Sequence, residues 1–385
     1  MKVFSLKLLV IAVISMIFLT VSPLFVSSSS SSGMTGGIYS EAYAVMDANT
    51  GEVLFGNNIN KPMYPASITK MVTAIITIET QEMDDVVTVS EKAVNAIGTR
   101  VYLLEGEEVT VQQLLHGLMV SSGNDAGIAL AEHIAGSVDN FADKMNDFLQ
   151  NHIGVKNTHF TNPHGLFDEK HVTTAKDMAE ISAYAMKNEA FRDLVSTGSV
   201  EWVGEGWETV LYNHHPLLRD QEMVIGIKNG YVRKSGYTLA TAAVKDDTEL
   251  IIITLSSPSR NHGVADTLKL LDYAFAHYET QWLTFENESP MADFIFPVKV
   301  PVSTNKNEEI TFTISDNGLL TVRGEENRLI SFSALEEREP LDLPFFSYDL
   351  PENTKKEENL SSNRADAHNF TDWLFVTGFL FLSLR

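Results

Sequence analysis

The chain is predicted to form an α+β fold, in which an antiparallel sheet packs beside a helical lobe, followed by a small all-β domain. Three observations support this class. Alternating strand patterns occur at both ends of residues 36–279, helical periodicity fills the middle of that stretch, and short alternating runs follow it. When the first and last segments of a domain are strands, their pairing can close one sheet that the intervening helices cover.

The strands at the two ends of this stretch have the form of hairpins. Residues 43–55 alternate in polarity around the turn Asp47-Ala-Asn-Thr-Gly51, and residues 237–244 and 249–256 flank the turn Lys245-Asp-Asp-Thr248. Turns rich in Asp, Asn and Gly between alternating runs are typical of β-hairpins.

The middle of the stretch has the periodicity of helices. Between residues 138 and 152, the side chains of Phe141, Met145, Phe148 and Leu149 fall on one stripe, which indicates a helix with one buried face. The predicted helices are residues 67–80, 111–120, 125–135, 138–152, 174–187 and 265–278.

After residue 279 the pattern changes to short alternating runs punctuated by Pro290, Pro297 and Pro301. Runs of this length between turn residues predict strands, and residues 286–348 are therefore assigned to the small all-β domain. The predicted strands are residues 294–300, 309–314, 319–322 and 329–332.

The composition limits the kinds of partner. The 385 residues are 44% hydrophobic, which is ample for a buried core, and 51 acidic against 28 basic residues give a formal net charge of −23. A surface of that charge repels nucleic acid and other polyanions. The sequence contains no cysteine, which excludes disulfides and thiolate metal sites.

The N-terminus has the order of a secretory signal peptide. Lys2 and Lys7 precede an apolar stretch that reaches Val26, and a run of serines follows, so residues 1–33 are assigned to a signal or N-terminal hydrophobic segment. The apolar stretch is also long enough to remain uncleaved as an anchor. We expect an exported protein at the extracytoplasmic face of the cell membrane, or a secreted one.

The C-terminus carries a second apolar segment. Residues 350–369 are polar and charged and indicate a linker. In residues 370–385 only about 12 consecutive positions are mostly apolar, fewer than the roughly 20 that span a bilayer. Trp373 and the terminal Arg385 favour insertion at the membrane surface, so this segment is a candidate anchor at the outer face of the cytoplasmic membrane.

The stretch Ser67-Ile-Thr-Lys70 carries the clearest chemical signal. It follows Pro65 at the start of a predicted helix, where positions i and i+3 share a face. A serine hydroxyl becomes a nucleophile when a base removes its proton, and a lysine desolvated in a closed site can be that base. A second copy of the pattern, from Ser303 to Lys306, lies in a polar stretch without helical periodicity and is interpreted as accidental.

Two further motifs follow in order. Ser122-Gly-Asn124 lies between two apolar helical runs, and Lys228-Asn-Gly230 ends an apolar strand. The order Ser-x-x-Lys, Ser-x-Asn and Lys-Thr/Ser-Gly is typical of penicillin-binding proteins and serine β-lactamases. Together with Ala42-Tyr-Ala-Val-Met-Asp-Ala-Asn-Thr-Gly and the stretch that ends in Asn-Pro-His-Gly-Leu166, these motifs resemble those of D-alanyl-D-alanine carboxypeptidases, the low-molecular-mass penicillin-binding proteins.

The resemblance implies a serine β-lactamase-like catalytic domain over residues 36–279. It also implies removal of the terminal D-alanine of peptidoglycan stem peptides through an acyl-Ser67 intermediate, with β-lactams as covalent inhibitors. In this interpretation Lys70 is the base, and Ser122 relays the proton to the leaving D-alanine. The backbone N–H groups of Ser67 and Tyr231 would form the oxyanion hole.

The remaining motif residues are expected to bind the substrate. The resemblance makes Asn124 a ligand of the substrate's peptide amide, and Lys228, Asn229 and Gly230 part of the same site. Burial beside Lys228 would also lower the pKa of the catalytic lysine.

The third motif departs from the family pattern. The family usually has Thr or Ser after the lysine and often Thr two residues after the glycine, where this chain has Asn229 and Val232. An arginine that the family often carries near the last helix aligns with Gly263. We expect the carboxylate of the substrate to be bound by other groups, for which the candidates are Lys228, Asn229, Arg233 and Arg260.

The eleven histidines do not form a metal-binding motif. No His-Glu-x-x-His spacing occurs, and no glycine-rich phosphate loop of the required spacing is present, so we expect neither a metal nor a cofactor. His164, in Asn162-Pro-His-Gly-Leu, is interpreted as structural.

Two other functions are compatible with part of the pattern. A serine β-lactamase needs a second carboxylate base after the Ser-x-Asn motif, typically in Glu-x-x-Leu-Asn, and residues 157–174 offer only Asp168 and Glu169 in another context. A degenerate penicillin-binding protein that binds wall peptides with little activity is favoured by Asn229 and Val232. Carboxypeptidase activity remains the main interpretation.

Overall fold

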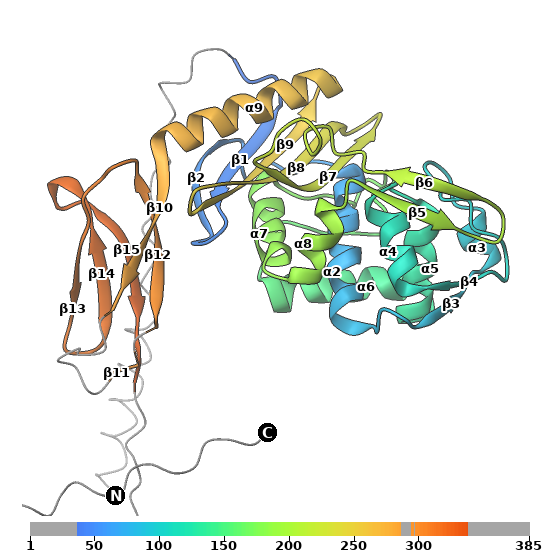
Figure 1. The fold of residues 1–385 in the computed structure, drawn as a ribbon, viewed down its shortest axis with the longest axis horizontal. Coiled ribbons are helices and arrows are strands. Elements are labelled where there is room, and N and C mark those ends of the chain that lie inside the picture. The colour runs from blue at the N-terminus through green and yellow to red at the C-terminus, as the bar shows by residue number, and fades with distance from the viewer. Residues whose placement is uncertain (1–36, 286–293, 296, 338–385) are drawn as a thin grey trace, which may run out of the picture. The chain divides into compact units, whose positions relative to one another are not determined.

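The computed structural model describes residues 37–285, 294–295 and 297–337. Its central element is a five-stranded antiparallel sheet in the order β2-β1-β9-β8-β7 (Figure 1). Because β1 pairs with β9, strands from the two ends of residues 36–279 close one sheet, as predicted. The strands are β1 (Ala42–Asp47), β2 (Glu52–Asn57), β7 (Val224–Val232), β8 (Gly236–Lys245) and β9 (Thr248–Ser257).

Side chains that alternate along these strands give the sheet two apolar faces. Val45 and Ile252 belong to a buried cluster with Leu271 of helix α9 (Arg260–His277), whereas their neighbours Met46 and Ile251 belong to the core of the helical lobe. Figure 1 accordingly shows α9 on one side of the sheet and α2, α7 and α8 on the other.

Helix α9 begins at Arg260 rather than at residue 265, the predicted start. The hydroxyl of Ser259 accepts a hydrogen bond from the backbone N–H of His262 and so caps the helix. A serine directly before a helical run is a start signal in the sequence, and the prediction overlooked it.

The helical lobe contains the predicted central helices, with small differences at their ends. Side-chain oxygens of Thr110, Ser137 and Thr174 cap three of these helices. The prediction missed α3, α8, which Asn188 caps, the antiparallel strand pair β3–β4 and the hairpin β5–β6. The elements are α2 (Lys70–Thr80), β3 (Val86–Thr88), α3 (Glu91–Val94), β4 (Glu108–Thr110), α4 (Val111–Met119), α5 (Asn124–Ala135), α6 (Val138–Phe148), α7 (Ala175–Met186), α8 (Glu189–Ser196), β5 (Ser199–Val203) and β6 (Glu208–Tyr212).

The described segment after α9 consists of strands and one short 3-10 turn, η3 (Glu325–Asn327), which agrees with the predicted small β domain, and Leu283, Val302, Leu320 and Val322 form its buried core. The run predicted as one strand over residues 294–300 is divided, since β11 ends at Ile295 and β12 begins at Lys299. The domain boundaries remain predictions. The strands are β10 (Tyr278–Thr284), β11 (Phe294–Ile295), β12 (Lys299–Asn305), β13 (Thr311–Ile314), β14 (Leu319–Arg323), β15 (Leu329–Ala334) and β16 (Glu336–Glu337).

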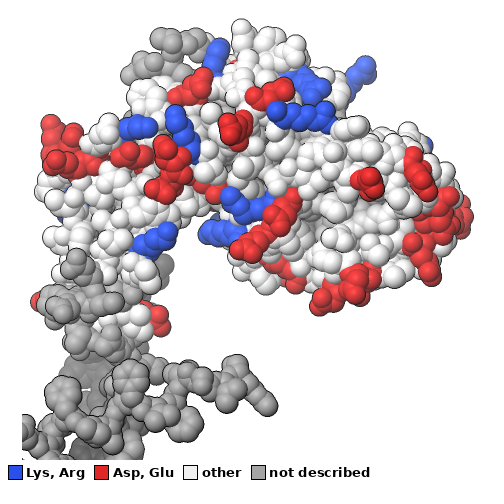
Figure 2. Space-filling model, in the orientation of Figure 1, with Lys and Arg blue, Asp and Glu red and all other residues white. Residues whose placement is uncertain are grey.

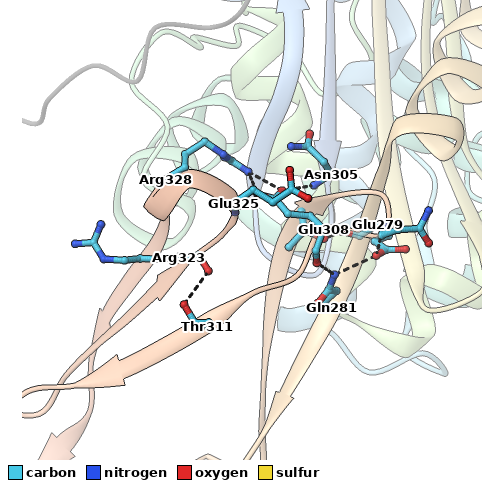
Figure 3. A network of polar contacts seen from close by, with 10 residues as sticks. Glu279, Gln281, Asn305, Glu308, Thr311, Arg323, Glu325 and Arg328 are labelled. Atoms are coloured by element: carbon cyan, nitrogen blue, oxygen red, sulfur yellow. Dashed lines mark hydrogen bonds and ion pairs between the residues drawn. The ribbon is translucent and has the colours of Figure 1, made fainter.

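The carboxylate of Glu308 joins two turns of this β segment (Figure 3). It accepts hydrogen bonds from the backbone N–H groups of Asn305 and Glu325, both at 3.1 Å, and from the guanidinium of Arg328 at 2.7 and 2.8 Å. Burial of Glu308 opposes ionisation, but these donors outweigh it and hold the pKa of Glu308 below its ordinary value. The ionised carboxylate therefore fixes the two turns relative to each other.

Acidic side chains gather at the end of the helical lobe that carries α3 and strands β3 to β6 (Figure 2). Exposed acids on these elements and their loops include Glu105, Glu108, Glu205 and Glu208. The expectation that the protein binds no nucleic acid rests on this charge and remains a prediction.

Within the described ranges, no helix combines the length and the apolarity that crossing a bilayer requires. The predicted segments 1–33, 350–369 and 370–385 lie outside those ranges.

Candidate active site

Ser67 lies in a short 3-10 turn, η1 (Ala66–Thr69), which runs directly into α2. The sequence predicted a helix that begins at residue 67, whereas the α-helix begins at Lys70 because the first turn is wound more tightly. Ser67 is half-buried, and Ala66 before it has a positive φ of 51°. The turn thus holds the Ser67 side chain at the end of a buried helix.

The side chain of Lys70 is fully buried, and its Nζ atom contacts three oxygen atoms. Oγ of Ser67 lies 3.2 Å away, Oδ1 of Asn124 lies 2.7 Å away, and the main-chain oxygen of His164 lies 2.9 Å away. The first two motifs of the sequence therefore meet at this nitrogen atom, together with a backbone carbonyl from a third segment.

The environment of Lys70 favours the neutral amine. Burial lowers the pKa of Lys70 well below its ordinary value, the charge of Lys228 lowers it further, and Asp125 acts in the opposite direction. Lys228 is also buried, and burial lowers its pKa to about 7. Among the ion pairs of the described residues, none includes either lysine. A neutral Lys70 has the lone pair that a general base requires.

Ser122 lies at the junction of α4 and α5 in a left-handed conformation, with a φ of 63°. It is only 6% exposed, and its hydroxyl forms no hydrogen bond to another described residue. The next residue, Gly123, has no room for a side chain, because a Cβ atom at that position would lie 2.9 Å from Oδ1 of Asp125. The junction therefore leaves the Ser122 hydroxyl without a hydrogen-bond partner among the described residues.

Asn124 is the first residue of α5, and both ends of its side-chain amide have partners. Oδ1 accepts the hydrogen bond from Lys70, and Nδ2 donates to the main-chain oxygen of Ile97 at 2.7 Å. The sequence predicted that Asn124 binds the substrate, which stays a prediction, and the structure shows that its side chain holds Lys70. This contact joins residues 54 positions apart, which no local pattern reveals.

The prediction missed Asp125, which fixes the loop beside the site. Its buried carboxylate accepts backbone hydrogen bonds from Val101 at 3.0 Å and from Tyr102 at 2.8 Å. Burial raises the pKa of Asp125, and these backbone N–H groups oppose the rise. Tyr102 is 57% exposed and meets the ring of Trp207 edge-on at 5.5 Å. An acid in the first turn of a helix is the only sequence signal for this residue.

The third motif lies on β7, one of the two edge strands of the sheet. Gly230 packs against η1, since a Cβ atom at this position would lie 2.6 Å from the backbone nitrogen of Ser67. Lys228 is 2% exposed, and its Nζ donates to the main-chain oxygen of Asn229 at 3.1 Å. Tyr231 is 55% exposed and lies against Tyr237, with ring centroids 4.5 Å apart. The strand thus brings Lys228 and Gly230 to the serine turn.

The residues that depart from the family pattern leave a polar atom without a partner. Oδ1 of Asn229 is buried and accepts no hydrogen bond within the described residues. The pKa of His214 is lowered first by burial and then by the charges of Lys228 and Arg260, which places His214 within electrostatic reach of both cations. Gly263, the position that aligns with the family's arginine, is buried in α9.

The loop Asn162-Pro-His-Gly-Leu166 supports the site through its backbone. The main-chain oxygens of Pro163 and His164 accept hydrogen bonds from Thr73 at 2.7 Å and Lys70 at 2.9 Å. Burial, followed by the charge of Lys70, lowers the pKa of the His164 imidazole to about 3. The backbone of His164 thus contacts Lys70 directly, and because this contact depends on loop conformation, residue type gives no signal for it.

Other candidates from the sequence lie apart from this cluster. Asp168 and Glu169 are exposed, and neither contacts Ser67 or Lys70. Ser303 lies within strand β12 and Lys306 follows its end, so the second Ser-x-x-Lys pattern is not on a helix. No group of three or more acidic or histidine side chains in the described residues is arranged to hold a metal ion.

The family model for D-alanyl-D-alanine carboxypeptidases matches residues 28–259. The chain is 33% identical to D-alanyl-D-alanine carboxypeptidase DacF of Bacillus subtilis strain 168, over 73% of this chain and 72% of that protein. It is 34% identical to D-alanyl-D-alanine carboxypeptidase DacA of Haemophilus influenzae, over 63% of each chain.

Solved structures with the same fold include penicillin binding protein 5 of Haemophilus influenzae. That structure has a TM-score of 0.70 and 26% sequence identity, over 79% of this chain and 97% of its own. Penicillin binding protein 6B of Escherichia coli has a TM-score of 0.68 at 26% identity, over 80% of this chain and 99% of its own. Both structures align with a larger share of this chain than the family model does. Their alignments therefore also cover part of the β segment that follows α9.

Proposed function

The chain belongs to the D-alanyl-D-alanine carboxypeptidase family of serine peptidases, and from this premise we propose that Ser67 is its acylated nucleophile and Lys70 its general base. The activity is the removal of the terminal D-alanine from peptidoglycan peptides. The assignment of residues rests on one observation, the contact of 3.2 Å between Nζ of Lys70 and Oγ of Ser67 at a fully buried lysine.

The hydrogen bonds of Lys70 explain how it acts as a base. A neutral amine has two N–H groups and one lone pair. Asn124 Oδ1 and the oxygen of His164 are the shorter contacts and accept the two N–H groups, which leaves the lone pair directed at the Ser67 hydroxyl. Ser67 then donates its proton to Nζ as its oxygen bonds to the carbonyl carbon of the penultimate D-alanine.

The oxyanion that forms is stabilised by the backbone N–H groups of Ser67 and Tyr231. Collapse of the tetrahedral intermediate breaks the bond between carbon and nitrogen, and the terminal D-alanine leaves after its nitrogen accepts a proton. We assign that transfer to Ser122, whose hydroxyl would pass its own proton to the leaving nitrogen and take up the proton that Lys70 received from Ser67, so that Lys70 is neutral again. Water then attacks the acyl-Ser67 ester while Lys70 accepts a proton from it. Lys70 returns this proton to Oγ of Ser67 as the ester bond breaks, which releases the shortened peptide and restores the serine hydroxyl.

Asn124, Lys228 and Asn229 are proposed to bind and orient the substrate. Lys228, with a pKa lowered by burial to about 7, places a cation beside the acylating pair. The amide of Asn229, which follows Lys228 directly on β7, is the candidate that replaces the family's hydroxyl, because its Nδ2 group can donate hydrogen bonds to a carboxylate. Asn124 contributes by holding Lys70 through Oδ1. To bind the substrate, its Nδ2 must give up the hydrogen bond to the main-chain oxygen of Ile97 and donate to the substrate instead.

The proposal is tested by labelling the full chain with a fluorescent penicillin and by measuring D-alanine release from diacetyl-Lys-D-Ala-D-Ala. The variants Ser67→Ala and Lys70→Ala should lose both penicillin labelling and D-alanine release, because the first has no nucleophile and the second has no base. The second Ser-x-x-Lys pattern supplies matched controls, Ser303→Ala and Lys306→Ala, which should label like the wild type. A Ser67→Ala protein that still becomes labelled would contradict the assignment.

The site of action is also a proposal. Peptidoglycan peptides are the substrate, and residues 1–33 have the order of an export signal, which together support action at the extracytoplasmic face of the membrane. The apolar residues 370–385 are proposed as the attachment to that face.

A further inference from the structure

The peptide unit between Ala66 and Ser67 is held from both sides. In a trans peptide the carbonyl and the N–H point in opposite directions. The N–H side faces β7, where a Cβ atom on Gly230 would lie 2.6 Å from the backbone nitrogen of Ser67. The carbonyl side faces Gly165, where a Cβ atom would lie 1.9 Å from the Ala66 oxygen. Because the peptide unit is planar, a contact that fixes the direction of the Ala66 carbonyl also fixes the direction of the Ser67 N–H.

Ala66 needs such fixation because its φ of 51° lies in the left-handed region, which residues with a Cβ rarely adopt. It is 1% exposed, so water does not reach its carbonyl to stabilise it. Its oxygen accepts a hydrogen bond from Oγ1 of Thr69 at 2.9 Å, and Thr69 is itself fully buried.

A chain of hydrogen bonds extends from this carbonyl to His171. Oγ1 of Thr69 lies 2.8 Å from Nε2 of His171, and Nδ1 of His171 accepts the backbone N–H of Thr161 at 3.0 Å. A backbone N–H can only donate, so Nδ1 carries no proton and Nε2 does. Nε2–H then donates to Thr69, whose single hydroxyl proton remains for the Ala66 oxygen.

The ring of His171 is fixed in this orientation by packing. It is 1% exposed and stacks on Phe160, with centroids 4.7 Å apart and an interplanar angle of 11°. Burial lowers the pKa of His171 to about 3, so the imidazole is neutral near pH 7 and keeps one donor and one acceptor.

We propose that His171 is a positioning residue for acylation, which acts through Thr69 to fix the Ala66 carbonyl and thereby aims the Ser67 N–H at the developing oxyanion. This inference rests on the proposed acylation of Ser67. His171 itself touches neither Ser67 nor Lys70. An oxyanion contact exists in the transition state and not with bound substrate, so a misaimed N–H lowers kcat and leaves KM nearly unchanged.

The test uses His171→Phe, which retains a flat ring on Phe160 but has no donor, and Thr69→Val, which removes the hydroxyl at constant shape. Complete loss of one oxyanion donor lowers the rate by about 10²–10³, so a misaimed donor should lower kcat for D-alanine release by about 10–100-fold. KM should change by less than about threefold. The double variant should lose little more than either single variant, because both remove the same chain of contacts.

Two further variants separate positioning from folding. His159→Phe replaces an exposed histidine whose backbone pairs with Val172 in the same segment, and it should retain wild-type rates. His171→Gln keeps an amide donor and should recover part of the loss. Thermal unfolding of every variant reports how much of it is folded at the assay temperature. If His171→Phe does not fold, Thr69→Val tests the proposal by itself, through a lowered kcat at a nearly unchanged KM.

The proposal is overturned if folded His171→Phe or Thr69→Val has a kcat within about threefold of the wild type, or if the two losses multiply in the double variant. Failure of the underlying function has a different result. In that case fluorescent penicillin does not label the wild type, or it still labels Ser67→Ala.

Discussion

The Nζ atom of Lys70 lies 2.7 Å from Oδ1 of Asn124, closer than the 3.2 Å that separate it from Oγ of Ser67. The asparagine of the second motif thus contacts the proposed base directly. An amide oxygen accepts a hydrogen bond from the amine without bringing a negative charge, so it orients Lys70 and leaves its lowered pKa largely intact.

Asn124→Asp should therefore shift the pH dependence of acylation. The new carboxylate would lie beside Nζ, favour the ammonium and raise the pKa of Lys70. Acylation should fall strongly near neutral pH and recover as the pH is raised. The measurement is the rate of labelling by fluorescent penicillin across pH, with Asn95→Asp as a surface control. A uniform loss at every pH would instead indicate that Asn124 acts mainly on the substrate.

Lys228→Met should also move this profile to higher pH. Burial is the main cause of the low pKa of Lys70 and remains in the variant, but the repulsion from Lys228 is lost, so the pKa of Lys70 rises. The half-maximal pH for acylation should increase, whatever happens to the maximal rate. Lys234→Met, in the exposed turn between β7 and β8, is the matched control. A half-maximal pH equal to or below that of the wild type would contradict the electrostatic role.

The double reversion Asn229→Thr, Val232→Thr tests how the substrate carboxylate is bound. The Nδ2 group of Asn229 offers two donors, and a donor is what a substrate carboxylate requires. The buried Oδ1 only accepts hydrogen bonds, so its lack of a partner among the described residues does not bear on carboxylate binding. If Asn229 has replaced the family's hydroxyls, the reversion should leave kcat/KM for D-alanine release unchanged or lower it. A gain of about tenfold or more, which corresponds to about 1.4 kcal/mol, would show that the carboxylate site is weakened in the wild type.

Deletion of residues 370–385 should move the protein from the membrane fraction to the soluble fraction while penicillin labelling stays unchanged. The segment holds the C-terminal apolar residues, and its burial at the lipid surface is the expected attachment. Deletion of residues 352–367, an equally long polar piece that leaves the tail in place, should keep the protein on the membrane. Membrane association that survives loss of the tail would point to an uncleaved N-terminal segment.

Local patterns predicted much of the fold. The hairpin β1–β2 and the paired strands β8 and β9 follow from alternation around polar turns, because the side-chain period of a strand is a property of the backbone itself. The prediction placed the start of α9 too late and did not distinguish the 3-10 turn η1 from the α-helix that follows it. Helix ends depend on single capping residues and on the packing of the first turn.

The sequence by itself determined the contact between Ser67 and Lys70, the proposed acylating pair, because a spacing of three residues at the start of a helical run places the two side chains on one face. Only the tertiary structure brought the carbonyl of His164 and the amide of Asn124 to Lys70, and His171 to the turn through Thr69, from 94, 54 and 102 positions away. These contacts arise when the helical lobe, the loop of His164 and the edge strand close around the lysine. That closure also removes water from Lys70, and desolvation is the main reason why its pKa falls.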